Sequence, residues 1–156
     1  MLDRFDLQLL KLVQRDDSRT ADQLAGEVAL SPSAIARRLR RLRATGVIAR
    51  TIALLSPELT SRRLRAIVHV QLSEHADQDG KRALLDRVRR VPQVQFCFEL
   101  AGVYDLLLLF DCAHMEEFTE TAEGVLVADP TVRRYETSFV RRDVKFEPYV
   151  GLGEAE

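Results

Sequence analysis

Five arginines occur within seven consecutive positions of the sequence, in the stretch RRLRRLR. In an α-helix, which rotates by about 100° per residue, Ile35, Leu39 and Leu42 fall within about 60° of one another and form an apolar stripe. The arginines then flank this stripe or lie opposite it. Because a planar guanidinium group pairs bidentately with phosphate and with the edge of guanine, this spacing is typical of a helix that binds nucleic acid.

The basic face of this predicted helix requires a compensating charge. Like charges on one helix face repel one another, and no acidic residue occurs between positions 31 and 46. We therefore expect the compensation to come from outside the helix, and a DNA major groove would supply it. A solvated face that binds nothing is the alternative. The residues predicted to contact DNA are Ser31, Ser33, Arg37, Arg38, Arg40 and Arg41.

Two further helices are predicted to position the basic helix. Asp3 is a suitable N-cap for a first helix that ends near Gln14. Thr20 and Gln23 have the spacing of a capping box at the start of a second, short helix. After a brief turn, Pro32 takes the first position of the third, basic helix. A short helix, a tight turn and a basic helix together predict a helix-turn-helix.

The turn and the segment after the basic helix are less regular. Ala29 stands where such turns often have a glycine, and a left-handed alanine costs about 1 kcal/mol, so we expect a differently built turn. Gly46 ends the third helix. Residues 47–55 then alternate weakly, which predicts a small β-wing before a linker. The linker arginines, which are either solvated or in contact with phosphate, are Arg62, Arg63 and Arg65.

From Leu64 onward the apolar pattern predicts a second domain. Strands are predicted over 64–73, 94–100, 105–112 and about 132–146, and helices over 78–91 and 115–125. The order βαββαβ is the ferredoxin-like split motif, in which both helices cover one face of an antiparallel sheet. The fold class is therefore α+β. We expect a (winged) helix-turn-helix domain with its linker over 1–60 and a ferredoxin-like domain over 61–156.

The other face of the predicted sheet needs a cover. Its candidate residues are Ile67, Cys97, Tyr135 and Phe139. A second subunit packed on this face would make a twofold dimer. Such a dimer also suits a helix-turn-helix, because two related half-sites on DNA match a twofold axis.

Composition separates the two halves of the chain and excludes several classes of protein. Residues 1–65 contain 13 Lys and Arg against 7 Asp and Glu, whereas residues 66–156 contain 10 against 17. This asymmetry suggests that the first half meets a polyanion. The N-terminus lacks the pattern of a secretory leader, and the run LLLLF is far shorter than the roughly 20 residues of a membrane span. We expect a cytoplasmic protein without membrane contact.

The residues that most often hold metals or act as nucleophiles are scattered. Cys97 and Cys112 lack metal-type spacing and are expected to be free thiols, and His69, His75 and His114 stand singly. No nucleophile has an evident base. We therefore expect no metal, no cofactor and no enzymatic activity.

Nearly the whole chain resembles the leucine-responsive/asparagine (Lrp/AsnC) family of transcription regulators. The matching stretches are LDRFDLQLLKLVQ, DQLAGEVALSPSAIARRLRRLRATGVI and AGVYDLLLLF. The resemblance implies a regulator whose dimers assemble into larger discs, often octamers, through the C-terminal domain. It also implies an effector, an amino acid or a related small molecule, bound between dimers against the loop that precedes the third strand.

The effector residues implied by the resemblance lie in that loop and on the last strand. A glycine lets backbone amides approach a carboxylate, and an aspartate accepts a hydrogen bond from an ammonium group, which suits a zwitterion. An ordinary hairpin turn is the alternative, since Gly and Asp are also common turn residues. The implied residues are Gly102, Val103, Tyr104 and Asp105. Thr137 and Ser138 are weaker candidates, for which a solvated or dimer-facing strand surface is the alternative.

Two rival functions remain at this point. One is a ligand-binding and oligomerisation module without DNA binding, for which the arginines would be dispensable. The other is an enzyme that resembles the siroheme decarboxylases, which would carry a tetrapyrrole. The preferred mechanism is a coupling, typically about 1–3 kcal/mol, in which the effector favours one assembly and the assembly sets how many helix-turn-helix pairs engage DNA.

Overall fold

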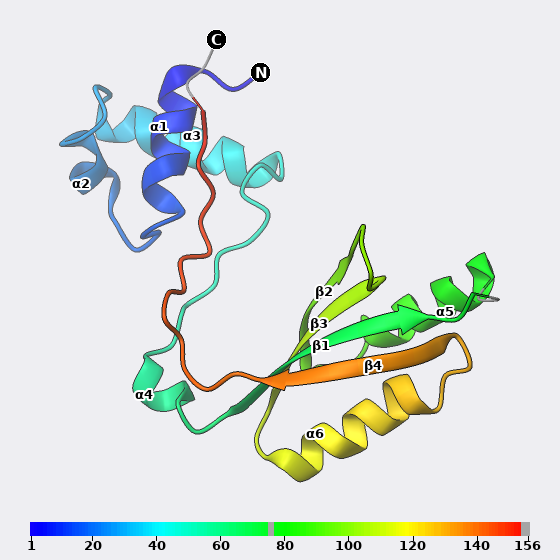
Figure 1. Cartoon of the computed structure of the whole chain (residues 1–156). Coiled ribbons are helices and arrows are strands. Elements are labelled where there is room, and N and C mark those ends of the chain that lie inside the picture. The colour runs from blue at the N-terminus through cyan, green and yellow to red at the C-terminus, as the bar shows by residue number, and fades with distance from the viewer. Residues whose placement is uncertain (75–76, 154–156) are drawn as a thin grey trace. The chain divides into compact units, whose positions relative to one another are not determined.

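The computed structural model describes residues 1–74 and 77–153, which form two compact units (Figure 1). The first unit comprises Met1–Leu54 together with the C-terminal segment from Lys145, and the second comprises Leu55–Val144. The division falls before the predicted boundary at residue 60, and the end of the chain packs with the first unit instead of the second. No helix among the described residues is long and apolar enough to cross a membrane.

Three helices build the first unit, and each begins at its predicted cap. They are α1 (Arg4–Val13), α2 (Ala21–Ala25) and α3 (Pro32–Ala44). The side chains of Asp3, Thr20 and Ser31 accept hydrogen bonds from backbone N–H groups in the first turns of these helices. The predicted helix-turn-helix is confirmed, and the apolar stripe of α3 faces the core. The most deeply buried core residues are Leu9, Leu24, Ile35 and Leu42.

The turn before α3 avoids the strain expected at Ala29. No non-glycine residue among those described has a positive φ; α2 ends at Ala25, and Gly26 after it still has right-handed helical dihedral angles. Gly46, after α3, has a φ of 74°, a left-handed conformation that glycine adopts without steric penalty. Residues 47–55, predicted as a β-wing, form no strand in the structure.

The C-terminal segment is fixed to the end of α1, where it is the red segment in Figure 1. The amide of Gln14 pairs with the backbone of Val150: its Nε2 donates to the carbonyl oxygen at 2.8 Å, and its Oε1 accepts from the N–H at 3.1 Å. The Arg15 guanidinium lies 4.3 Å from the centre of the Tyr149 ring. These contacts explain why the tail belongs to the first unit.

Replacing Gln14 by alanine should lower the free energy of unfolding of the first unit by about 1 kcal/mol, because two hydrogen bonds to the tail are lost. Gln8→Ala is the matched control, since Gln8 is exposed on the same helix and no hydrogen bond of its side chain occurs among the described residues. Chemical denaturation followed by circular dichroism measures both variants. Equal stabilities would show that the tail does not stabilise α1.

The second unit is an antiparallel sheet with helices on one face. Its elements are α4 (Pro57–Thr60), β1 (Leu64–Leu72), α5 (Gln78–Val88), β2 (Val94–Glu99), β3 (Leu106–Cys112), α6 (Met115–Ala122), the π-helical turn η1 (Glu123–Val127) and β4 (Val132–Phe139). The strand order is β2-β3-β1-β4. This is the predicted ferredoxin-like arrangement. The short α4, in the linker, has no counterpart among the predicted elements.

The last strand ends at Phe139, well before the predicted end near residue 146. β4 follows β1 until Phe139 lies opposite Ala66, and the Val140 N–H then donates to the Arg65 carbonyl oxygen at 2.8 Å. β1 begins at Leu64, so the chain beyond this point has no strand to pair with. The sequence pattern alone does not reveal where a partner strand stops.

The helix-covered face of the sheet contains the core of the second unit. α5, α6 and η1 bury alternate strand residues on this side. The main strand contributions are Ala66, Val68, Val70, Leu106, Leu108 and Phe110. Three of the residues predicted for the opposite face also lie on the helix-covered side. They are Cys97, which pairs opposite Leu108, Tyr135, which pairs opposite Val70, and Phe139, whose ring meets that of Phe118.

The opposite face of the sheet, which we call the open face, has no cover among the described residues. Phe96 and Phe98 lie on it with 43% and 53% of their surface exposed, and their rings are stacked with centres 6.0 Å apart. Both pair with β3 residues that in turn pair with Ile67 and His69 of β1. The open face therefore carries an apolar surface centred on aromatic side chains.

Candidate functional site

The outward face of α3 presents two arginines and a serine to solvent. Ser33, Arg37 and Arg40 are exposed, and neither arginine forms an ion pair with a residue that the structure describes. Ser31 is the N-cap of the helix, since its hydroxyl oxygen accepts from the Ala34 N–H at 3.3 Å. The oxygen atoms of the Ser31 and Ser33 side chains lie 3.1 Å apart. The two serine hydroxyls therefore lie at the start of α3, and the guanidinium groups of Arg37 and Arg40 follow on the same exposed side of the helix.

Arg38 and Arg41, also predicted to contact DNA, form ion pairs with aspartates of the first unit. The Nη1 atom of Arg38 lies 2.7 Å from Asp3 Oδ2 and 2.8 Å from Asp6 Oδ1. The Nη2 atom of Arg41 lies 2.6 Å from Asp6 Oδ2. Asp6 is fully buried, and each of its carboxylate oxygens pairs with one guanidinium group of α3. Arg38 in addition lies over the ring of Phe5.

The ionisation of this cluster follows from its hydrogen bonds. Burial alone would raise the pKa of Asp6, but hydrogen bonds from Arg41 and Arg38 outweigh burial and lower the pKa below its ordinary value. Hydrogen bonds to Asp3 and Asp6 raise the pKa of Arg38. The cluster is therefore fully charged at neutral pH and joins α1 to α3.

A third aspartate compensates another arginine of the row. Arg43 Nη2 lies 2.6 Å from Asp17 Oδ1, whose other oxygen accepts from the Thr51 hydroxyl at 2.8 Å. Much of the charge compensation that was expected from outside the helix therefore comes from α1 and the loop after it. Asp6 carried a signal in the sequence: at helical spacing it falls inside the apolar stripe of α1, where a charged residue requires a buried partner.

The loop between β2 and β3 contains the four predicted effector residues. Gly102 and Val103 are exposed at its tip, whereas Asp105 fixes its base. The Asp105 Oδ2 atom accepts from the Leu72 N–H at 2.8 Å, and its own N–H donates to the Val70 carbonyl oxygen at 2.9 Å. The Asp105 carboxylate is therefore already a hydrogen-bond acceptor for the backbone at the end of β1.

The Tyr104 ring forms a polar cluster at the edge of the open face. Its centre lies 5.1 Å from that of His69, and the Arg134 guanidinium lies 5.9 Å from it. A hydrogen bond with Glu136 raises the pKa of the Tyr104 hydroxyl. A cation, an anion and an aromatic ring therefore occur together beside the loop, and Arg134 Nη1 lies 3.6 Å from Glu136 Oε1 in an exposed ion pair.

Thr137 and Ser138 do not lie together. As neighbours on β4 they point to opposite faces of the sheet: Thr137 pairs opposite the buried Val68, and Ser138 opposite Ile67 of the open face. Ser138 can therefore belong to a site on the open face, whereas Thr137 cannot.

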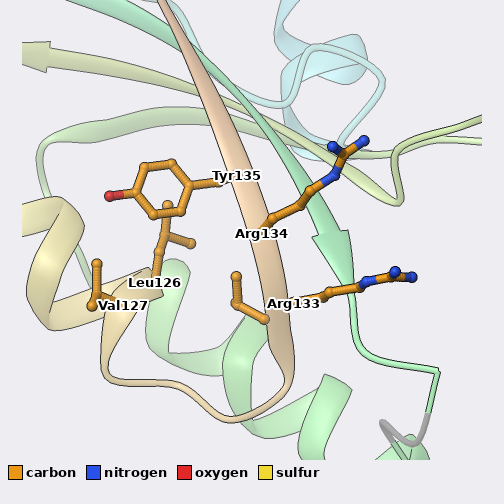
Figure 2. A pocket seen from close by; sticks show the side chains of 6 residues that line it. Leu126, Val127, Arg133, Arg134 and Tyr135 are labelled. Atoms are coloured by element: carbon orange, nitrogen blue, oxygen red, sulfur yellow. The ribbon is translucent and has the colours of Figure 1, made fainter.

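A hollow of about 340 Å³ lies between η1 and the start of β4. Figure 2 shows that Leu126, Val127 and the Tyr135 ring lie on one side of β4, while the side chains of Arg133 and Arg134 extend to the other. The guanidinium groups thus point away from the apolar part of the hollow. This geometry offers an apolar contact but no charge to orient a ligand.

The remaining candidate side chains have structural positions. Cys97 is half-buried and Cys112 buried, both as free thiols, and burial raises the pKa of each. His114 caps α6 with its Nδ1, whereas His75 lies outside the described residues. No cluster of three or more His, Cys, Asp or Glu side chains suited to a metal occurs in the described ranges.

Comparison with known proteins agrees with this division of the chain. A model of the winged helix-turn-helix DNA-binding domain matches residues 2–49, and a model of the Lrp/AsnC ligand-binding domain matches residues 65–150. The HTH-type transcriptional regulator y4tD of Sinorhizobium fredii is 34% identical over 92% of this chain and 85% of its own length. The DNA-binding transcriptional activator DecR of Escherichia coli K12 is 30% identical over 94% and 95%.

Solved structures give the same result. The transcriptional regulator NMB0573 of Neisseria meningitidis, in complex with L-Met, superposes with a TM-score of 0.85 and 31% identity over 97% of each chain. The predicted combination of a DNA-binding helix-turn-helix and a ligand-binding domain of α+β fold is thereby confirmed. The relatives are named as transcriptional regulators and not as enzymes. This chain belongs to the Lrp/AsnC family of transcriptional regulators.

Proposed function

We propose that the protein binds specific DNA sites through the outward face of α3, with Arg37 and Arg40 as the main contacts and Ser31 and Ser33 at the start of the helix. The observation that carries this proposal is the free state of the two arginines, which have no ion pair among the described residues, in a row whose other members are compensated. A guanidinium group without an internal partner is available for guanine edges and phosphates. Because its partner is genomic DNA, the protein acts in the cytoplasm.

Selection of genomic fragments by the purified protein, repeated over a series of salt concentrations, tests this proposal. A sequence-specific regulator enriches discrete fragments, and its affinity falls steeply as salt rises because counterions are released from the DNA. Fragments bound without enrichment would contradict sequence-specific recognition, and no binding at all would favour the rival reading of a ligand-binding module without DNA binding.

The effector in this proposal is an amino acid bound at the loop between β2 and β3. The Neisseria relative was crystallised with L-Met. In this chain Arg134 and Glu136 form an exposed ion pair of 3.6 Å beside Tyr104, and an amino acid would separate this pair and give each charge its carboxylate or ammonium partner. Gly102, Val103 and Ser138 would complete the contact surface, whereas Thr137 faces the helices. Binding of the effector at this loop changes the equilibrium between oligomeric states of the protein. The oligomeric state in turn sets the number of DNA-binding units that act together.

Asp105→Ala should abolish the response of DNA binding to an amino-acid mixture while leaving effector-free affinity within about twofold. The Leu72 N–H loses its acceptor in this variant, so the loop loses its attachment to β1, and the second unit should lose about 1–2 kcal/mol of stability. Asp79→Ala, at an exposed position of α5, is the control. Fluorescence anisotropy with labelled DNA measures the response. Loss of effector-free binding would contradict the assignment of Asp105 to the effector loop.

The open face of the sheet is the proposed dimer interface. Phe96 and Phe98 expose a continuous aromatic surface there, and a second copy that covers it would bury this surface around a twofold axis. The dimers are proposed to assemble further, to an octamer. A dimer places two copies of α3 on related half-sites, which explains why a DNA-binding chain carries this surface.

The protein acts as a regulator without enzymatic activity in this proposal. The competing enzyme would hold a tetrapyrrole, which absorbs visible light strongly. An absorption spectrum of the purified protein, with and without added siroheme, distinguishes the two: binding followed by conversion of the tetrapyrrole would overturn the regulator assignment.

A further inference from the structure

The arginines of α3 fall into two groups with different surroundings. Arg38 and Arg41 share the buried carboxylate of Asp6, one at each oxygen. Arg37 and Arg40 are exposed and have no ion pair among the described residues. The same helix therefore carries both bound and available cations, and Asp6 separates the two groups.

We propose that Asp6 is a specificity-determining residue, because it withholds Arg41, and together with Asp3 also Arg38, from DNA phosphates and so limits sequence-independent binding. This inference rests on the proposed binding of DNA through α3. It goes beyond that proposal by assigning a role in recognition to an acidic side chain of α1 that does not itself touch DNA.

The competition between Asp6 and a phosphate favours Asp6. Its side chain is 1% exposed, and it also accepts from the Asp3 N–H at 3.2 Å. A phosphate that captured Arg41 would have to break a charge-assisted hydrogen bond of 2.6 Å and leave one oxygen of a buried carboxylate without its guanidinium. Half of the Arg41 side chain is exposed, so a phosphate could reach it, and the ion pair with Asp6 is what keeps it from binding that phosphate.

Withholding these cations affects the two kinds of DNA binding unequally. Contacts to phosphate are independent of sequence and supply essentially all of non-specific binding. In a specific complex, base contacts fix the position of α3, and a freed arginine reaches phosphate only where that position permits. In a non-specific complex the protein settles wherever phosphates are within reach. Release of Arg41 from Asp6 therefore strengthens non-specific binding more than specific binding.

The test uses full-length Asp6→Asn, a duplex of the selected sequence and a duplex of unrelated sequence, titrated between about 50 and 200 mM salt. We expect the slope of log affinity against log salt on the unrelated duplex to steepen by about one unit, because Arg41 is freed while Arg38 keeps its ion pair with Asp3. Binding near 100 mM salt should be roughly tenfold tighter. Affinity for the selected duplex should change less. Asp22→Asn, which removes an exposed carboxylate without an ion pair among the described residues, should leave the slope unchanged.

A second pair of variants decides the question if Asp6→Asn does not fold. Arg41→Ala should leave the slope of the wild-type protein unchanged, whereas Arg40→Ala should flatten it by about one unit. An unchanged slope in folded Asp6→Asn, or an equal flattening in Arg41→Ala and Arg40→Ala, would overturn the inference while the proposed function stands. Absence of wild-type binding to any fragment would overturn both.

Discussion

Replacing Arg37 and Arg40 together by alanine lowers affinity for the selected DNA sequence by a factor on the order of 100 or more. Each lost base contact costs about 1–3 kcal/mol, and each lost phosphate contact flattens the salt dependence by about one unit. Both side chains are exposed on α3 and lack ion pairs among the described residues, so their removal leaves the core of the first unit intact. The melting temperature of the variant should therefore stay close to that of the wild-type protein.

The control for this pair removes the same charge from the second unit. Arg89 and Arg90 are exposed at the end of α5, and Arg89 forms a surface ion pair with Asp86. Replacing both by alanine should change DNA affinity by less than about threefold, because neither arginine belongs to the helix-turn-helix unit and salt weakens the attraction between exposed charges and DNA. If the Arg37 and Arg40 variant binds the selected sequence as tightly as this control, α3 is not the recognition helix.

The sequence was sufficient for the helices of the first unit because their signals are local. Capping residues, the proline at the first position of α3 and the apolar stripes all act within a few residues of the helix they define. The ion pairs could not be predicted in the same way. Arg38 and Asp6 are 32 positions apart, and only the packing of α1 against α3 brings them together. The position of Asp6 inside an apolar stripe was the one indication of such a partner.

The errors in the second unit have a related cause. Alternation predicts that a strand has two faces, but the choice of the buried face depends on pairing with neighbouring strands. Cys97 appeared suited to the open face, yet its register opposite Leu108 turns it toward the helices and exposes Phe96 and Phe98 instead. The end of β4 was misplaced because it depends on where β1 begins. Non-local pairing, and not local preference, decided both features.

Phe98→Asp should convert the protein to a monomer at micromolar concentration. Phe98 has 53% of its surface exposed on the open face and stacks with Phe96, so in the proposed dimer it lies inside the interface. A carboxylate at this position would be buried without a partner on both sides of the twofold axis, which costs several kcal/mol per charge. In the isolated chain the same side chain faces water, and the fold of the second unit should be retained. Light scattering coupled to size-exclusion chromatography measures the mass directly.

Val127→Asp provides the matched control. Val127 is also an exposed apolar residue, but it belongs to η1, which packs on the helix-covered side of the sheet and not on the open face. This variant should remain a dimer or a larger assembly.

DNA binding connects the two proposals: a monomer engages one half-site at a time and loses the gain from bivalent binding, which is typically about 10²–10⁴-fold. Phe98→Asp should therefore lose affinity for a paired site while keeping wild-type affinity for a single half-site. A Phe98→Asp protein that keeps the mass of the wild-type assembly would place the interface elsewhere and leave the aromatic surface of the open face without its proposed partner.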